Sequence, residues 1–280
     1  MMLLFNLLLA SLLPLTPAKV DPAFRAMTWN IRYDNPLDGP DAWSARRERV
    51  SGLIRYHAPD VLGIQEGLAH QVAYLQAELP AYNVVGVGRD DGKAAGEYCA
   101  LFYRKDRYAV LDSGTFWLSP TPEMPSKGWD AALNRICTYA VLKDLQGGKQ
   151  LLVLNTHFDH VGETARVQSA KLLLEKIKAT TSKGRAVVLL GDLNTEPGSA
   201  PIQTLTQATQ DARTVCKTTP YGPEGTFNGF RLATAPLDKR IDYVFVQHLS
   251  VLQYAVLAEQ ELGRYPSDHL PVLAVFSFQF

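Results

Sequence analysis

The chain has 280 residues, of which 46% are hydrophobic and 20% charged, and its 28 basic side chains balance 28 acidic ones. The ordinary charge content, and the lack of repeated apolar runs long enough to cross a bilayer, exclude collagen-like, disordered and multi-span membrane proteins. A net charge of zero gives no global electrostatic signal for nucleic acid or an anionic membrane, although it leaves a local basic patch open. The length allows one large domain or two small ones.

The N-terminal segment, 1–18, has no charged side chain and contains an apolar run from Leu3 to Leu15. A helix that crosses a bilayer needs about 20 apolar residues, so this run is short for an anchor. It is typical of a secretory signal peptide cleaved between Ala18 and Lys19, apart from the lack of Lys or Arg before the run. We therefore expect a signal peptide over 1–18 and a secreted or periplasmic protein, with an uncleaved anchor as the alternative.

Beyond Lys19, short apolar strands alternate with amphipathic helices. Helices are predicted around 50–57, over 69–79 and over 164–179, and 193–240 is predicted to be mostly loop. The predicted strands are 24–29, 61–64, 82–87, 98–103, 108–116, 137–142, 151–156, 186–190, 241–246, 251–257 and 270–278. Because no linker-like composition divides this series, we expect one domain, 19–280, with an α/β or α+β layered sandwich.

Several of these strands end in, or begin after, a polar residue. The residues in these positions are Asn30, Glu66, His157, Asp192, Asp242, Asp268 and His269. Ligand sites in open sheets gather beyond strand ends, where loops converge without disturbing the core. Carboxylates beside apolar runs are costly to bury unless a hard cation or a charged partner neutralises them. The pattern therefore predicts a metal site.

Other chemistries find no support in the sequence. Cys99, Cys137 and Cys216 are too few and too scattered for a disulfide framework or a zinc site, and we expect all three to be buried thiols. The sequence contains neither the His-Glu-x-x-His motif of zinc proteases nor the Gly-x-Ser-x-Gly motif of serine esterases.

Six short motifs together resemble the endonuclease/exonuclease/phosphatase family of metal-dependent phosphoesterases. In the family's order, they are Thr28-Trp29-Asn30, Gln65-Glu66, Asn155-Thr156-His157, Gly191-Asp192-Leu193-Asn194, Arg240-Ile241-Asp242-Tyr243 and Ser267-Asp268-His269-Leu270-Pro271. The opening 29–36 is similar to an uncharacterised bacterial branch of the family. The resemblance implies a four-layer α/β/β/α sandwich, in which two mixed, mainly antiparallel sheets pack between helices.

The resemblance also implies a metal site. Glu66 would be the principal Mg²⁺ ligand, helped by Asn30 and Asp268, since Mg²⁺ prefers oxygen donors; Mn²⁺ is an alternative ion. Nuclease members often carry an acidic or amide residue two positions after the first Asn, and Arg32 stands there in this chain. We therefore expect one Mg²⁺ rather than two.

The catalytic roles follow from the same motifs. Asp192, beside Asn194, would position or deprotonate the attacking water. His269, oriented by Asp242, would hold a phosphate oxygen or move a proton, because the pKa of imidazole lies near neutrality.

Three residues are expected to bind the phosphate group itself. They are Arg135, whose guanidinium matches phosphate oxygens in a fork, together with His157 and Asn194.

Each of these residues also has a purely structural interpretation. An Asn after a strand is often a turn residue, and Glu66 could cap the next helix. Asp242 could pair with Arg240, and His157 could be a hydrogen-bonded core residue. The six motifs in order favour the catalytic interpretation.

Other polar residues near the motifs are less specific. Asp159, His160 and Glu97 could face the site. Arg46 and Arg47 could contact substrate, although arginines at the start of a helix are more often solvated.

We therefore expect a monomeric Mg²⁺-dependent phosphoesterase that hydrolyses phosphodiesters, or phosphomonoesters, by attack of an activated water. A nuclease and an inactive binding module of the same fold are the alternatives. Arg46 and Arg47 form the only dense basic run we find, so a compact phosphate ester is favoured over nucleic acid.

Overall fold

The computed structural model describes residues 23–181, 184–232 and 236–279, so the predicted signal peptide lies outside the described residues. The strands of the first sheet are β1 (Phe24–Asn30), β2 (Val61–Gln65), β3 (Tyr82–Val85), β4 (Leu101–Arg104), β11 (Leu249–Val256) and β12 (Val272–Phe278). They form a six-stranded sheet in the order β11-β12-β1-β2-β4-β3. Only β1 and β2 run parallel among these pairs, and the others are antiparallel.

A second six-stranded sheet has the order β5-β6-β7-β8-β10-β9. Its strands are β5 (Tyr108–Trp117), β6 (Ile136–Asp144), β7 (Gln150–His157), β8 (Ala186–Asp192), β9 (Gln210–Asp211) and β10 (Asp242–Gln247). Here β7 and β8 form the parallel pair, and the other pairs are antiparallel. Each sheet thus contains one parallel pair within a mainly antiparallel arrangement, as predicted.

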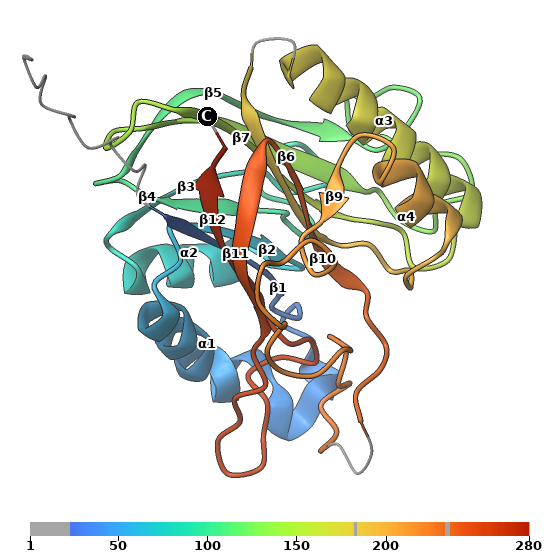
Figure 1. The fold of residues 1–280 in the computed structure, drawn as a ribbon. Coiled ribbons are helices and arrows are strands. Elements are labelled where there is room, and N and C mark those ends of the chain that lie inside the picture. Colours follow the sequence, from blue (N-terminus) through green and yellow to red (C-terminus); the bar gives the residue numbers. More distant parts are fainter. Residues whose placement is uncertain (1–22, 182–183, 233–235, 280) are drawn as a thin grey trace, which may run out of the picture.

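Helices lie on the outer face of each sheet (Figure 1). The first sheet is covered by α1 (Trp43–His57) and α2 (Ala69–Glu78), and the second by α3 (Glu163–Thr181) and α4 (Ala200–Leu205). A short 3-10 helix, η1 (Pro36–Asp41), precedes α1. The result is the four-layer sandwich that the resemblance implied.

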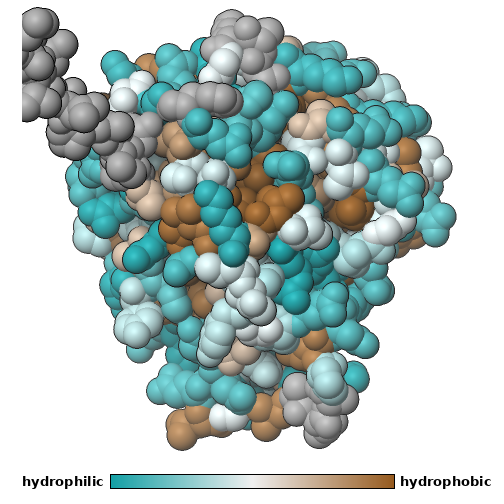
Figure 2. Space-filling view, viewed as in Figure 1, coloured by the Kyte–Doolittle hydropathy of each residue, from teal (hydrophilic) through white to brown (hydrophobic). Residues whose placement is uncertain are grey.

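Three apolar layers hold the sandwich together. Alternate side chains of β1 point to opposite faces, so Phe24 and Ala26 enter the layer between the sheets, whereas Met27 and Trp29 pack under α1 and α2. A third layer fills the space between the second sheet and its helices. The surface in Figure 2 is mostly hydrophilic, with apolar residues gathered near the middle of the view.

Some predicted elements differ from the structure. The predicted strand 98–103 begins only at Leu101, because Tyr98 instead forms isolated bridges with Gly67 and Gly88. The predicted loop 193–240 contains α4 and β9. Cys216 is half-buried, unlike the two other cysteines, because it lies outside the packed strands. No described helix is long and apolar enough to cross a membrane.

One buried amide joins the two sheets. Asn155, on β7, donates hydrogen bonds to the carbonyls of Ile64 (2.8 Å) and Ala100 (2.9 Å) in the first sheet. Its Oδ1 accepts a hydrogen bond of 2.6 Å from Gln65 Nε2. Gly63 makes room for this contact, since a Cβ there would lie 2.7 Å from Asn155 Cγ.

Asn155→Ala is expected to lower the free energy of unfolding by about 3 kcal/mol, because it leaves buried carbonyls and the Gln65 amide without partners. Asn83→Ala, at an exposed position of β3, is the matched control and should change stability by less than about 0.5 kcal/mol. Urea unfolding followed by circular dichroism measures both. Equal stability of the two variants would show that the inter-sheet amide contributes nothing.

Candidate active site

The polar strand ends meet at one edge of the sandwich. Parallel pairing places Asn30 beside Gln65 in the first sheet and His157 beside Asp192 in the second. Asp242 begins the antiparallel β10 directly opposite Asp192. The antiparallel β12 begins near the same edge, where β1 ends, and His269 lies just before it. Carboxyl ends of parallel strands and amino ends of their antiparallel neighbours thus converge.

Strand alternation also turns these side chains inward. Residues two apart share a face, so Asp192 follows Val188 and Leu190 into the space between the sheets. Asp242 is placed likewise ahead of Val244. Asp192 and Asp242 therefore lie at the edge of the apolar layer between the sheets and do not face the helices.

These side chains border a cavity of about 400 Å³. Its lining is Arg32, Tyr33, Glu66, Glu97, Leu133, Arg135, His157, His160, Asp192, Asn194, Phe227, Asp268 and His269. Seven of the predicted site residues are among them. Asn30 and Asp242 lie behind the lining, where they contact Glu66, Asp192 and His269.

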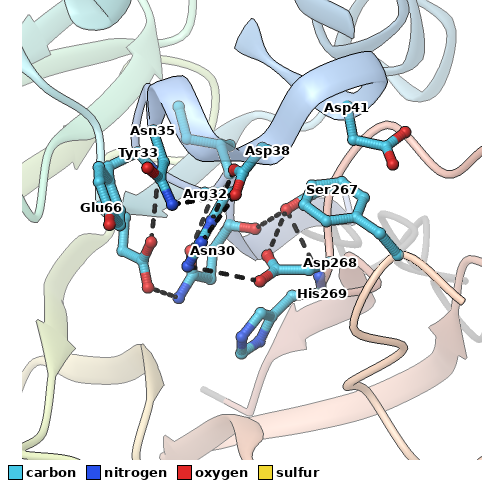
Figure 3. A network of polar contacts seen from close by, with 12 residues as sticks. Asn30, Arg32, Tyr33, Asn35, Asp38, Asp41, Glu66, Ser267, Asp268 and His269 are labelled. Carbon is cyan, nitrogen blue, oxygen red and sulfur yellow. Dashed lines mark hydrogen bonds and ion pairs between the residues drawn. The ribbon is translucent and has the colours of Figure 1, made fainter.

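Asn30 fixes two carboxylates from different sheets. Its Nδ2 donates to Glu66 Oε1 at 2.9 Å (Figure 3). The same nitrogen donates to Asp192 Oδ2 at 3.0 Å. Its Oδ1 accepts from the backbone N–H of Arg32 at 3.0 Å, and Glu66 Oε2 accepts from that of Tyr33 at 3.1 Å. Both ends of the Asn30 amide are therefore engaged with the protein, and its role as a metal ligand stays a prediction.

Glu66 and Asp268 provide a donor set that fits a divalent cation. Both offer carboxylate oxygens, which Mg²⁺ prefers. Burial raises the pKa of Asp268, the charge of His269 opposes this, and the charge of Glu66 adds to it. The nearest described cation, Arg32 Nη1, lies 3.8 Å from Asp268 Oδ2, beyond hydrogen-bond distance. The carboxylates thus hold more negative charge than their neighbours neutralise, and a bound cation would correct this.

Asp192 is suited to accept a proton near neutral pH. Burial, and next the charge of Asp242, raise the pKa of Asp192 to about 7. Its Oδ1 accepts from the backbone N–H of Asn194 at 2.9 Å, and Asn194 has a left-handed backbone with φ 48°. A base whose pKa lies near the working pH is the efficient one.

His269 and Asp242 form a buried ion pair. His269 Nδ1 lies 2.9 Å from Asp242 Oδ2, and His269 Nε2 lies 3.8 Å from Asp192 Oδ2. Burial alone would lower the pKa of His269, but the charges of Asp242 and Asp192 raise it well above its usual value. His269 is therefore a proton donor at neutral pH, and Asp242 orients its ring. The sequence also allowed a structural ion pair between Asp242 and Arg240, but Arg240 pairs with Asp211 at 2.6 Å.

Ligand atoms of Asp192, Asp242 and His269 also lie within 4.8 Å of one another, a spacing that could hold a metal ion. The imidazolium ring offsets one of these two carboxylate charges, and its Nδ1 is already bound to Asp242 Oδ2 at 2.9 Å, so this His269 nitrogen is not free to bind a cation. The set of Glu66 and Asp268 therefore fits a cation better.

His157 is a neutral ring in this environment. Burial, and next the charges of Arg135 and Arg89, lower the pKa of His157 well below its usual value. Asn194 Nδ2 lies 3.0 Å from His157 Nε2, which assigns the ring proton to Nδ1. Within the described chain Nδ1 has no hydrogen-bond partner, and Glu97 Oε2 lies 3.9 Å from it.

Arg135 lines the cavity and has one nitrogen without a partner among the described residues. Its Nε donates to Asp159 Oδ2 at 3.3 Å, and its Nη2 lies 3.0 Å from His160 Nδ1. Burial would raise the pKa of the Asp159 carboxyl, but hydrogen bonds from backbone N–H groups outweigh this effect and lower it. The carboxylate that binds Arg135 therefore stays charged. Nη1 of Arg135 is buried, and no described residue accepts from it. Asp159 and His160 thus hold Arg135 rather than facing the site independently.

Sequence reasoning missed the role of Arg46. Instead of being solvated, Arg46 is fully buried and donates to the carbonyls of Ile31, Arg32 and Pro266, with distances of 2.7 Å to Arg32 and 3.3 Å to Pro266. Burial lowers its pKa to about 10. Trp43, Arg46 and Val50 are three and four residues apart, so they share one face of the helix. This spacing could have predicted that Arg46 is buried. Arg47, by contrast, is exposed and stacks on Tyr74.

Comparison with known proteins gives the family. The Endonuclease/Exonuclease/phosphatase family matches residues 27–269. A solved endonuclease/exonuclease/phosphatase from Bacteroides vulgatus is 43% identical with a TM-score of 0.87, covering 92% of this chain and 99% of that one. The mannosyl-6-phosphatase of Bacteroides thetaiotaomicron is 37% identical with a TM-score of 0.87, covering 91% and 100%.

A more distant relative has a different kind of substrate in its name. Tyrosyl-DNA phosphodiesterase 2 of Rattus norvegicus is 23% identical over 64% of this chain and 43% of its own length. The family match, which spans almost all of the described residues, agrees with the fold and with the converging strand ends. The chain belongs to the Endonuclease/Exonuclease/phosphatase family.

Proposed function

We propose that the chain is a Mg²⁺-dependent phosphoesterase that hydrolyses compact phosphate esters. The observation that carries this proposal is the single cavity in which oxygen ligands, a base and phosphate-binding donors meet. Glu66 and Asp268 would hold the ion, Asp192 is the base, and Arg135 supplies a donor. When bound, Mg²⁺ polarises a phosphoryl oxygen and stabilises developing negative charge.

The protein's own residues carry the proton transfers. Asp192, in its ionised form, takes a proton from the attacking water as the new O–P bond forms. The P–O bond to the leaving group breaks, and His269 donates a proton to the departing oxygen. Asp242 keeps the His269 ring oriented and stabilises its charged form.

The phosphate group would lie against the other side of the cavity. Arg135 offers its unpartnered Nη1 to a phosphoryl oxygen. The two N–H groups of the Asn194 amide, which lines the same cavity, are already engaged by His157 Nε2 and by the carbonyl of Phe158, each at 3.0 Å, so Asn194 would hold the phosphate only by giving up one of these bonds. His157 shares Asn194 Nδ2 and keeps that amide in place. Mn²⁺ offers the same preference for oxygen ligands and is the alternative ion.

A compact substrate agrees with the relatives and the charge. The mannosyl-6-phosphatase shares 37% identity, which supports a sugar phosphate or a similar small ester. The balance of 28 basic and 28 acidic residues gives no general attraction for a polyanion. A phosphodiesterase that acts on nucleic acid, such as a nuclease, is the second candidate, because tyrosyl-DNA phosphodiesterase 2 is also a relative. Turnover of bis-(p-nitrophenyl) phosphate or p-nitrophenyl phosphate with Mg²⁺ distinguishes an enzyme from an inactive binding module.

We also propose that the protein is exported and that it is a monomer. The uncharged apolar segment 1–18 supports the export. N-terminal sequencing of protein secreted by the native host tests it, with a start at Lys19 as the expected result.

Glu66→Gln is expected to weaken Mg²⁺ binding at least tenfold, because it removes a charged ligand. Wild-type affinity should rise between pH 6 and pH 8, since the pKa of Asp192 is raised to about 7 and a proton on this neighbouring carboxyl removes negative charge from the site at the lower pH. Calorimetric titration at the two pH values measures both effects. Glu78→Gln, which removes an exposed partner of Arg55, is the control. Unchanged Mg²⁺ affinity in Glu66→Gln would remove Glu66 from the ligand set.

Asp192→Asn and His269→Ala should each lower kcat at least about 100-fold, the loss typical of a general acid or base. His57→Ala is the control, because His57 pairs with Glu259 on the surface of α1. Steady-state kinetics on a phosphate ester measures the effect, and circular dichroism confirms that each variant is folded. A wild-type rate in either variant would exclude the role assigned to that residue.

The substrate class has its own test, in which KM is measured against salt for a DNA duplex and for a small phosphate ester. We expect turnover of the small ester to equal or exceed that of DNA, with a KM that changes little between 50 and 200 mM salt. A protein that neutralises several phosphates loses affinity steeply over that range. A low KM for DNA that rises steeply with salt, together with negligible turnover of the small ester, would instead identify a nuclease.

A further inference from the structure

Arg32 holds a guanidinium group rigidly at the cavity (Figure 3). Its Nε and Nη2 donate to the two carboxylate oxygens of Asp38, both at 3.0 Å. Asn35 in turn donates to Asp38 Oδ1 at 3.0 Å, and the guanidinium lies 4.7 Å from the centre of the Tyr33 ring. A guanidinium bound through a fork has little freedom to turn, so the direction of its third nitrogen is fixed.

The backbone of Arg32 is held as firmly as the side chain. Arg32 has a left-handed conformation with φ 56°, which is unfavourable for a residue with a Cβ. Its N–H donates to Asn30, and its carbonyl accepts from Arg46 (2.7 Å) and Gln71 (3.0 Å). Strained residues persist only where their surroundings over-determine them, and they cluster at functional sites.

The third nitrogen, Nη1, is the one that faces the site. It makes no hydrogen bond within the described chain, and its nearest carboxylate oxygen, Asp268 Oδ2, is 3.8 Å away. Arg32 and Arg135 line the same cavity from different sheets. Each has one guanidinium nitrogen that makes no hydrogen bond within the described chain: Nη1 of Arg32, in a long ion pair with Asp268, and the buried Nη1 of Arg135 on the side of the second sheet.

We propose that Arg32 binds a charged phosphoryl oxygen that a phosphate monoester has and a diester lacks, which makes phosphate monoesters the preferred substrate class. This inference rests on the proposed function. A monoester has three non-bridging oxygens and carries nearly two negative charges at neutral pH, since its second pKa is about 6. In a diester, one of these oxygens is esterified and uncharged. Arg32 and Arg135 would each hold one charged oxygen, and Asp38 is the positioning residue for Arg32.

The test compares two substrates with the same leaving group, p-nitrophenyl phosphate and bis-(p-nitrophenyl) phosphate. Arg32→Gln should lower kcat/KM for the monoester about 10- to 100-fold, the loss expected for a charge-assisted hydrogen bond, and for the diester less than about threefold. Arg32→Lys, which keeps the charge but cannot form the fork with Asp38, should recover part of the loss. Asp38→Asn should shift selectivity in the same direction as Arg32→Gln. Arg47→Gln, on the exposed face of α1, is the matched control.

A binding measurement separates this inference from the proposed function. In the presence of Mg²⁺, inorganic phosphate should bind Arg32→Gln at least tenfold more weakly than wild type by calorimetric titration. Equal losses for the two esters, or unchanged phosphate affinity, would overturn the role of Arg32 and leave the phosphoesterase proposal standing. A wild type that turns over neither ester with Mg²⁺ or Mn²⁺ would overturn the proposed function, whereas the phosphate titration would still decide the role of Arg32.

Discussion

The contact between the two sheets decides whether a site exists at all, because each sheet supplies only part of it. The first sheet and its loops carry Asn30, Glu66, Asp268 and His269, and the second carries His157, Asp192 and Asp242. Asn155 fixes the distance between the sheets through buried hydrogen bonds to Ile64, Gln65 and Ala100. A slip of one sheet on the other would separate Asn30 from Asp192 and His269 from Asp242. The packing of the core and the geometry of the chemistry are therefore one constraint.

Most of the charge near this edge is arranged in pairs. His269 faces Asp242, Arg135 faces Asp159, Arg89 faces Glu97 at 2.5 Å, and Arg32 faces Asp38. Each pair offsets the cost of burying its members. Glu66, Asp268 and Asp192 have no such partner within hydrogen-bond distance among the described cations, and Asp192 partly escapes the cost because its pKa is raised to about 7. This unbalanced charge, rather than any single residue, is what indicates the place of a cation.

The sequence predicted the strand ends well because a buried strand shows itself as an apolar run, and the polar residue that ends it is conspicuous. The predicted residues Glu66, Arg135, His157, Asp192, Asn194, Asp268 and His269 do line one cavity. What the sequence could not provide was the pairing across sheets, such as Asn30 with Asp192, which depends on tertiary register. Arg46 was expected to be solvated because it is charged, although its spacing along the helix places it on the buried face. The elements η1 and α4 were not predicted, because each has only six residues and therefore shows too little periodicity. The Pro and Gly residues of η1 also favour a loop.

Three residues of the site have a left-handed backbone although none is glycine: Arg32, Glu66 and Asn194, with φ of 56°, 63° and 48°. At Arg32 and Glu66 a glycine would adopt the same backbone more easily, so the native residues are retained at a cost to the folded state. Selection for heat resistance alone would therefore favour changes at these two positions, and it would move the chain away from its own chemistry. Thermal tolerance and turnover thus oppose each other here, and a laboratory evolution that screens only for stability would be expected to erase the site before it alters the sandwich.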